Sequence, residues 1–393
     1  MSLFCSRLFL PYLESRFFRV LLFSVLVCWF AGASPVLAGE DNWWPIQVKS
    51  YYGVYDADKK VPGQACDCLK GPKLEEWTAP QKAVRPYTIG VSFPHMKDSY
   101  WVAVNYGIIQ EARRLGVGIK LLEAGGYDNL DKQVEQLREL SRANVDGIIL
   151  GSVHYRATDG IIAETAAKEI PVVEVVNDVH APQVTAKALV SFYDMGYYAG
   201  EFLAEQAESF GRDNLKIAFF PGPEGSGWAP ETLHGFEDAM QYFPGNIEIV
   251  AVKWGDTGND IQSRLIRDVL DEQESIDYLV GNAVAATAAP AIIEERGRTG
   301  IGVVSTYIIP SLYDKIAKGR VLASPSDLTV FQGRMAVDMM VRILDGDKPG
   351  KDFPFRSGPF IPTVTTENIG SYPYEGLFGP RDYKPVFNLA PEK

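Results

Sequence analysis

Aromatic side chains dominate the positions at which this sequence could bind a small molecule. Tyr100 and Trp101 stand next to each other in the segment KDSYWVAV, shortly after Asp98. Ring faces attract trimethylammonium-like groups, and a tyrosine hydroxyl or an indole N–H can donate a hydrogen bond to a ligand oxygen. A phosphate or carboxylate ligand would instead require Arg or a glycine-rich helix start. We therefore expect a site for a small ligand with a cationic, apolar group, and its candidate residues are Asp98, Tyr100, Trp101, Tyr127, Phe192, Trp254, Asp256 and Tyr307.

Each aromatic residue also has an explanation in packing alone. Trp101 could be the first buried residue of a helix that Asp98 caps, as readily as a ligand contact. Tyr127 follows two glycines and could simply close a turn. Trp228 could equally pack in a core or line a cleft, and Tyr106, farther along the first helix, is expected in the core.

Catalytic and metal chemistry find little support in the sequence. Asp256, Thr257 and Gly258 match the aspartic-protease triplet, but only once, whereas that mechanism needs two carboxylates. The chain has no G-x-S-x-G elbow, no Walker-type loop and no His or Cys residues at zinc spacing. We expect neither an enzyme nor a bound metal or cofactor.

Charge and cysteine content agree with an exported binding protein. The net charge of −12 and the absence of a Lys/Arg cluster argue against nucleic acid as a partner. Beyond residue 38 the only cysteines are Cys66 and Cys68. A local disulfide is the expectation for an oxidising compartment, and metal binding is the less favoured alternative.

The N-terminus has the three regions of a secretory signal peptide. Basic residues precede the apolar run VLLFSVLVCWF, which small residues follow up to Ala38. An apolar run of this length is too short to span a bilayer. We expect cleavage near Ala38 and export of the mature chain, and the family resemblance given below implies the periplasm.

Two similar halves are expected to position the candidate residues. From Tyr87 onward, short apolar runs alternate with amphipathic stretches, which is the pattern of an α/β fold with parallel sheets. The pattern then repeats, so that Ile217 and Gly235 stand at the positions of Ile89 and Gly107. Ligands of such sheets bind at the carboxyl ends of the strands, where most of the candidate residues stand.

The expected organisation has two Rossmann-like lobes joined by a hinge of several strands. It comprises a signal peptide (1–38), an irregular leader that packs on the body (39–84), a first lobe (85–186 and 325–352), a second lobe (187–324 and 353–370) and a tail (371–393).

Five segments point to a known family: FPHMKDSYWVAVNYG, LLEAGGYDNL, VSFYDMGYYAG, FFPGPEGSGW and WGDTGND. Together they resemble the TorT family of type I periplasmic binding proteins, over residues 43–364. The resemblance implies a bilobed protein without catalytic activity that closes on trimethylamine N-oxide. It also implies contact with the periplasmic domain of a TorS-like sensor histidine kinase.

The family's aromatic ligand box falls on Tyr100, Trp101, Tyr127, Phe192 and Tyr307. The family has Trp at the position of Phe192, and Phe keeps the ring face but lacks the N–H donor. The resemblance therefore implies trimethylamine N-oxide or a related methylated amine as the ligand.

A transport receptor is the alternative function. The substrate-binding component of an ABC importer for a sugar or small amine would have the same fold and use the same cleft. Asp178, Asn282 and Asp327 are candidates for binding sugar hydroxyls.

Overall fold

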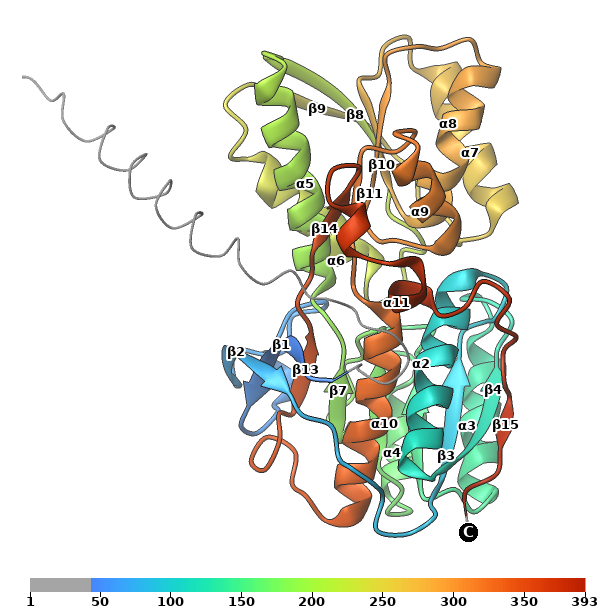
Figure 1. Ribbon diagram of the computed structural model, residues 1–393. Coiled ribbons are helices and arrows are strands. Elements are labelled where there is room, and N and C mark those ends of the chain that lie inside the picture. Colours follow the sequence, from blue (N-terminus) through green and yellow to red (C-terminus); the bar gives the residue numbers. More distant parts are fainter. Residues whose placement is uncertain (1–43, 393) are drawn as a thin grey trace, which may run out of the picture. The chain divides into compact units, whose positions relative to one another are not determined.

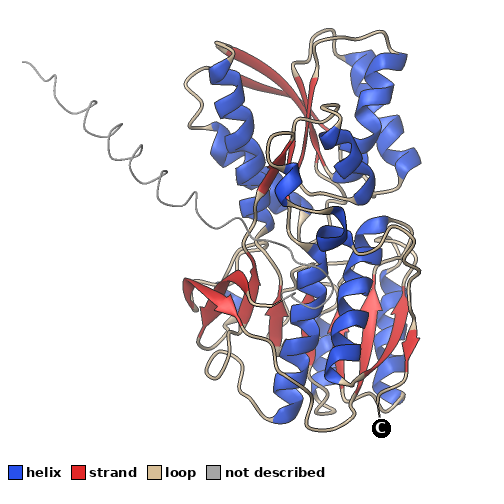
Figure 2. Ribbon diagram, in the orientation of Figure 1, coloured by secondary structure: helices blue, strands red, loops and turns tan. Residues whose placement is uncertain are grey.

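The computed structural model describes residues 44–392, and the expected signal peptide lies outside these described residues (Figure 1). Two separate sheets with helices packed on them form the described chain (Figure 2). The expected α/β fold of two similar lobes on mainly parallel sheets is confirmed.

The first lobe is built on a nine-stranded sheet of order β15-β4-β3-β5-β6-β7-β13-β1-β2. Its strands are β1 (Ile46–Tyr52), β2 (Lys70–Trp77), β3 (Thr88–Phe93), β4 (Gly118–Glu123), β5 (Gly147–Leu150), β6 (Val172–Val175), β7 (Ala186–Ala188), β13 (Arg356–Pro359) and β15 (Asn388–Leu389). Its helices are η1 (Ala57–Lys59), α2 (Ser99–Leu115), α3 (Leu130–Arg142), α4 (Asp159–Ala166) and α10 (Thr329–Asp345).

The second lobe is built on a six-stranded sheet of order β14-β12-β11-β10-β8-β9. Its strands are β8 (Asn214–Phe220), β9 (Asn246–Val252), β10 (Tyr278–Gly281), β11 (Gly302–Ser305), β12 (Ala323–Pro325) and β14 (Thr363–Thr365). Its helices are α5 (Phe192–Ser209), α6 (Ala229–Met240), α7 (Asn259–Glu272), α8 (Ala283–Glu295) and α9 (Pro310–Ala317), while η2 (Ile369–Ser371) and α11 (Tyr374–Phe378) follow β14.

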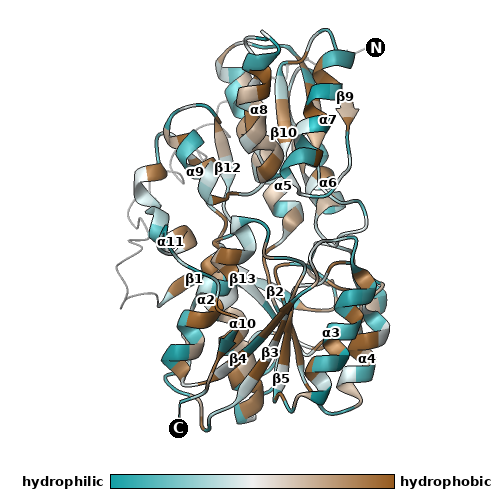
Figure 3. Cartoon of the chain, turned by 90° about the vertical axis from the view of Figure 1, so that its right-hand side faces the viewer, coloured by the Kyte–Doolittle hydropathy of each residue, from teal (hydrophilic) through white to brown (hydrophobic). Residues whose placement is uncertain are grey.

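The repeat seen in the sequence is a repeat of strand order. β4-β3-β5-β6-β7 in the first sheet and β9-β8-β10-β11-β12 in the second have the same parallel arrangement. Figure 3 shows the apolar strands β3 and β5 flanked by helices with hydrophilic faces. Because helices cover the faces of such sheets, ligands bind at their carboxyl edges.

The two equivalent glycines mark the same close helix crossing in each lobe. A Cβ on Gly107 of α2 would lie 2.0 Å from the Val330 carbonyl oxygen of α10, and a Cβ on Gly235 of α6 would lie 2.0 Å from the Tyr193 carbonyl oxygen of α5. No side chain fits at either crossing. These crossings fix the helices whose N-termini reach the carboxyl edges.

The chain passes between the two sheets at residues 189–191, 326–328 and 360–362, and it returns to the first sheet between β14 and β15. This multiple connection matches the expected hinge. The boundary expected at residue 353 is wrong in one detail, because β13 pairs with β7 and β1 in the first sheet and only β14 joins the second.

The leader and the tail are more ordered than the sequence indicated. Residues 46–77 contain β1 and β2, which extend the first sheet because β13, from far along the chain, supplies the partner for β1. In the tail, β15 pairs antiparallel with β4. The partner strands of both segments are distant in sequence, so the local periodicity of the sequence does not predict these pairings.

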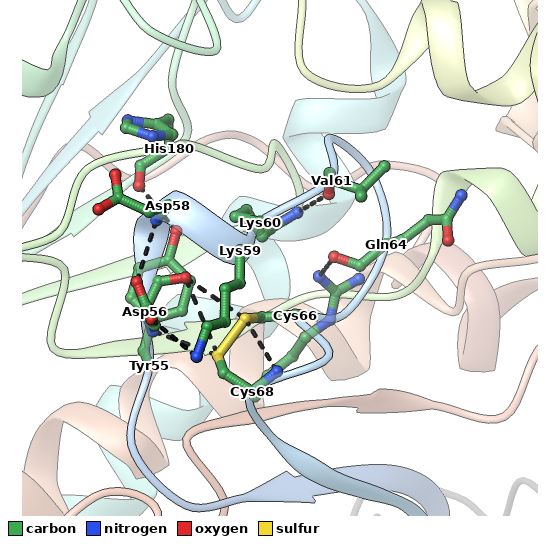
Figure 4. Close-up of a disulfide and its surroundings, with 11 residues drawn as sticks. Tyr55, Asp56, Asp58, Lys59, Lys60, Val61, Gln64, Cys66, Cys68 and His180 are labelled. Atoms are coloured by element: carbon green, nitrogen blue, oxygen red, sulfur yellow. Dashed lines mark hydrogen bonds and ion pairs between the residues drawn. A yellow bond between two sulfur atoms is a disulfide. The ribbon is translucent and has the colours of Figure 1, made fainter.

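A disulfide joins Cys66 to Cys68, as expected, in the loop between β1 and β2 (Figure 4). The same loop is tied to the first lobe by a buried ion pair between Lys60 and Asp178 and by the Gly63 N–H, which donates to the Asp178 carboxylate at 2.9 Å. Within residues 44–392, no helix combines the length and the apolar character needed to cross a bilayer.

Candidate ligand-binding site

A small pocket lies where the carboxyl edges of the two sheets face each other. The first lobe contributes Asp98, Tyr100, Trp101, Tyr127, Val176 and Asn177, and the second lobe contributes Phe192, Trp228, Thr257 and Tyr307. Six of these side chains are aromatic, and none is basic. A pocket of this size suits a ligand of few atoms.

The start of α2 places the first group of pocket residues. Asp98 caps the helix, and its Oδ1 accepts hydrogen bonds from the backbone N–H groups of Tyr100 at 3.1 Å and Trp101 at 3.4 Å. The cap fixes the direction in which both aromatic side chains leave the helix. Trp101 packs on Phe93 with a ring-centroid distance of 4.6 Å, so it belongs to the core and lines the pocket as well.

The end of β6 places Asn177. Val176 has a φ of +66°, a left-handed conformation that is rare and strained for a β-branched residue. This turn directs Asn177 into the pocket, where its Nδ2 donates to the Tyr127 hydroxyl at 3.0 Å and to the Ser152 carbonyl at 2.7 Å. Tyr127 is thereby held by a partner from a different strand.

The second lobe completes the aromatic wall. Phe192 is the first residue of α5, Trp228 directly precedes α6, and Tyr307 follows β11. The Trp228 ring lies 5.7 Å from both Phe192 and Tyr307, and 6.4 Å from Tyr127 across the lobes. Tyr307 also packs edge-on against Tyr100 at 5.3 Å. The rings of the two lobes therefore form one continuous aromatic enclosure.

Two carboxyl groups determine the charge around this enclosure. Burial raises the pKa of Asp98 to about 6, although the two backbone N–H bonds and nearby Lys97 act in the opposite direction. Burial also raises the pKa of Asp327 to about 6, against hydrogen bonds from the Tyr100 hydroxyl and from Gln332. Asp98 lines the pocket, whereas Asp327 lies behind Tyr100 and orients its ring. An ionised Asp98 would favour a ligand with a positive centre.

The structure brings six of the eight candidate residues to this pocket: Asp98, Tyr100, Trp101, Tyr127, Phe192 and Tyr307. Trp254 and Asp256 do not line it. Trp254 packs against the core, and Asp256 forms an ion pair with Lys97 of the other lobe at 2.5 Å.

Four pocket residues were not among the candidates. Trp228 and Asn177 both follow strands, and Trp228 stands within one residue of the position equivalent to Trp101 in the repeat. The repeat spacing could therefore have identified Trp228 as a residue of the site. Thr257 and Val176 have ordinary side chains for a strand end, and no sequence signal distinguishes them.

Within residues 44–392, no group of three or more His, Cys, Asp or Glu side chains is arranged to hold a metal ion. The pocket residues are suited to enclosing a methylated ammonium group and to binding an oxygen through N–H or O–H donors.

The chain belongs to the periplasmic binding protein family, because residues 89–348 match the model described as the periplasmic binding protein domain. It is a ligand-binding protein and not an enzyme.

Three relatives refine this placement. The periplasmic protein TorT of Escherichia coli strain K12 is 33% identical over 311 residues, which is 79% of this chain and 87% of TorT. A crystal structure of the TorS sensor domain–TorT complex in the presence of TMAO matches with a TM-score of 0.67 at 32% identity, over 77% of this chain and 99% of that chain. An ABC transporter solute-binding protein from Bradyrhizobium sp. BTAi1 with bound Bis-Tris matches with a TM-score of 0.73 at 37% identity, over 89% of this chain and all of that one.

Proposed function

We propose that the protein is a periplasmic receptor for trimethylamine N-oxide or a closely related methylated amine, and that it reports the ligand to a TorS-like sensor histidine kinase. The signal peptide would direct export and would then be cleaved near Ala38. The TorT relative and the TorS–TorT complex support both the ligand class and the partner.

The aromatic enclosure with one carboxyl group is the observation that carries this proposal. Tyr100, Trp101, Tyr127, Trp228 and Tyr307 provide ring faces for methyl groups, and Asp98 provides the negative charge. Cation–π attraction is strongest where the ring and the cation are both removed from water, and Trp101 and Trp228 are 2% and 3% exposed.

A sugar ligand fits the same pocket less well. Of the three residues considered for sugar hydroxyls, none lines the pocket: Asp178 is paired with Lys60 and Lys187, Asn282 caps α8, and Asp327 is bonded to Tyr100. Their hydrogen-bonding groups already serve the protein itself.

An importer of small amines is the second candidate. The Bradyrhizobium relative is described as an ABC transporter protein and contains Bis-Tris, a molecule with a tertiary amine. The pocket chemistry is the same in both cases, so the two functions differ only in the membrane partner.

The mechanism follows from the position of the pocket between the lobes. Residues of both lobes line it, so a bound ligand contacts both and stabilises their closed arrangement. A ligand with higher affinity for the closed state shifts the population toward it and changes the surface that the kinase contacts.

Isothermal titration of residues 39–393 with trimethylamine N-oxide, glycine betaine and ribose tests the proposal. We expect the N-oxide to bind and Trp101→Ala to abolish binding. Each titration is repeated with the purified periplasmic domain of the candidate kinase, whose affinity for the protein should change with the N-oxide. Binding of ribose alone would contradict the ligand, and an unchanged kinase affinity would favour the importer.

A further inference from the structure

Two pocket-lining residues of the second lobe have a buried polar group that makes no hydrogen bond of ordinary geometry with the described residues, although the Trp228 indole lies near enough to the Tyr127 hydroxyl to act on its pKa. The two groups are the indole Nε1–H of Trp228 and the Oγ1 hydroxyl of Thr257. Both side chains are buried, with exposed fractions of 3% and 4%. A buried donor without a partner is costly, and most such groups in folded proteins are satisfied. Two of them lining one pocket point to a ligand atom that accepts hydrogen bonds.

The surrounding chain fixes the Trp228 ring in place. The ring edge lies against Gly222, where a Cβ would be 2.5 Å from Cη2 of the indole. Gly227, directly before Trp228, lies against the Asp178 carbonyl oxygen, where a Cβ would be 2.2 Å away. Since the ring also contacts Phe192 and Tyr307, it cannot turn to find another partner for its N–H.

The two sides of the pocket differ in charge. The first lobe contributes the Asp98 carboxyl group, whereas the corresponding position before α6 is Ser226. The Ser226 hydroxyl is used within its own turn, where it donates to the Pro223 carbonyl at 2.8 Å and accepts from the Ala229 N–H at 3.2 Å. The second lobe therefore offers only uncharged donors, and the first offers an anion.

We propose that Trp228 and Thr257 form the subsite for the ligand's oxygen, while Asp98 and the first-lobe rings hold its ammonium group. The ligand class is then a dipolar amine with an acceptor oxygen on or next to the nitrogen, and this inference rests on the proposed function. The first lobe holds the ammonium group, and the hydrogen bonds to the oxygen then attach the second lobe to the same ligand.

Tetramethylammonium is the probe that isolates the oxygen, because it replaces the oxygen of trimethylamine N-oxide by a methyl group. Titration calorimetry compares both compounds on the wild type, on Trp228→Phe and on Thr257→Val. Phe keeps a ring face without the N–H, and Val keeps the shape of Thr without the hydroxyl. We expect each variant to lose about tenfold or more in affinity for the N-oxide and to lose much less in affinity for tetramethylammonium.

Two control variants test the specificity of the effect. Trp254→Phe makes the same change in the same lobe outside the pocket, and Thr257→Ser keeps the hydroxyl. Trp254→Phe should retain wild-type affinity for the N-oxide, and Thr257→Ser should restore most of the affinity that Thr257→Val loses. Thermal unfolding of every variant checks that it is folded.

The outcomes separate this inference from the proposed function. Equal losses for both probes, or no loss for either, would overturn the oxygen subsite and leave the receptor function standing. A wild type that binds tetramethylammonium as tightly as the N-oxide would overturn it even if a variant failed to fold. A wild type that binds neither probe would overturn both proposals.

Discussion

Asp98 serves two purposes with one side chain. Its Oδ1 caps α2, and the carboxyl group also lines the pocket. Burial raises its pKa to about 6, so it changes charge within the physiological pH range. A cationic ligand prefers the ionised form, and ligand binding must therefore lower this pKa.

Binding of a quaternary ammonium ligand should strengthen as the pH rises. Asp98 is mostly protonated at about pH 5 and mostly ionised above about pH 7, so affinity increases across this window and then levels off. The gain is about tenfold for each unit by which the ligand lowers the pKa. Titrations with tetramethylammonium, whose own charge does not change with pH, measure it.

Asp98→Asn is the control, because the amide oxygen can still accept the backbone hydrogen bonds. This variant should bind weakly with a flat pH profile. Asp327 titrates in the same range but lies behind Tyr100. A pH dependence that survives Asp98→Asn would assign the effect to Asp327.

At the scale of single elements, the glycine crossings are the tightest constraints on the site. The α5–α6 crossing at Gly235 and Gly196 fixes the two helices that begin at Phe192 and Trp228. At Gly196 a Cβ would lie 1.8 Å from the Thr232 carbonyl oxygen. A shift at this crossing therefore moves two walls of the pocket together.

Gly235→Ala should lower the free energy of unfolding by about 1–3 kcal/mol, because the added methyl overpacks the crossing. Gly160→Ala in α4 is the matched control, since no atom lies within 4 Å of its Cβ position. There the loss of backbone freedom in the unfolded chain should stabilise the protein by about 0.5–1 kcal/mol. Urea unfolding measures both, and equal effects would contradict the packing argument.

Local pattern was enough to predict the elements that carry most of the site. The alternation of apolar runs with amphipathic stretches indicated the α/β elements, and the helix that Asp98 was expected to cap begins at Ser99. β1 and β13 were not predicted as partners, because about 300 residues separate them and neither has a clear alternation. Pairing at that range depends on tertiary packing, which sequence periodicity does not report.

The same reasoning explains the outcome for the site residues. Those that directly follow predicted strands, such as Tyr100 and Tyr127, were found because topology alone brings strand ends together. Asp256 has the same kind of position but turns to Lys97 of the other lobe. Only the three-dimensional structure shows the direction of such a side chain.

At the scale of the whole molecule, ion pairs join the two lobes, and one of them lies next to the pocket. The ion pair between Lys97 and Asp256 joins the start of α2 to the loop after β9. Both residues are next to pocket residues, Asp98 and Thr257 respectively. Because this ion pair joins one residue of each lobe, a change in the angle between the lobes would break it.

Asp256→Asn should weaken binding of trimethylamine N-oxide by up to about fivefold, because it removes a partly exposed ion pair that joins the two lobes next to the pocket. The loss should shrink at high salt. Lys253→Met, which breaks the Lys253–Glu272 pair within the second lobe, is the control and should leave affinity unchanged. The charge of Asp256 also raises the pKa of Asp98, so without it Asp98 would ionise more readily and hold an ammonium group better. Tighter binding by Asp256→Asn would therefore mean that Asp256 acts through Asp98, and weaker binding with a more open solution scattering profile would mean that it acts through closure.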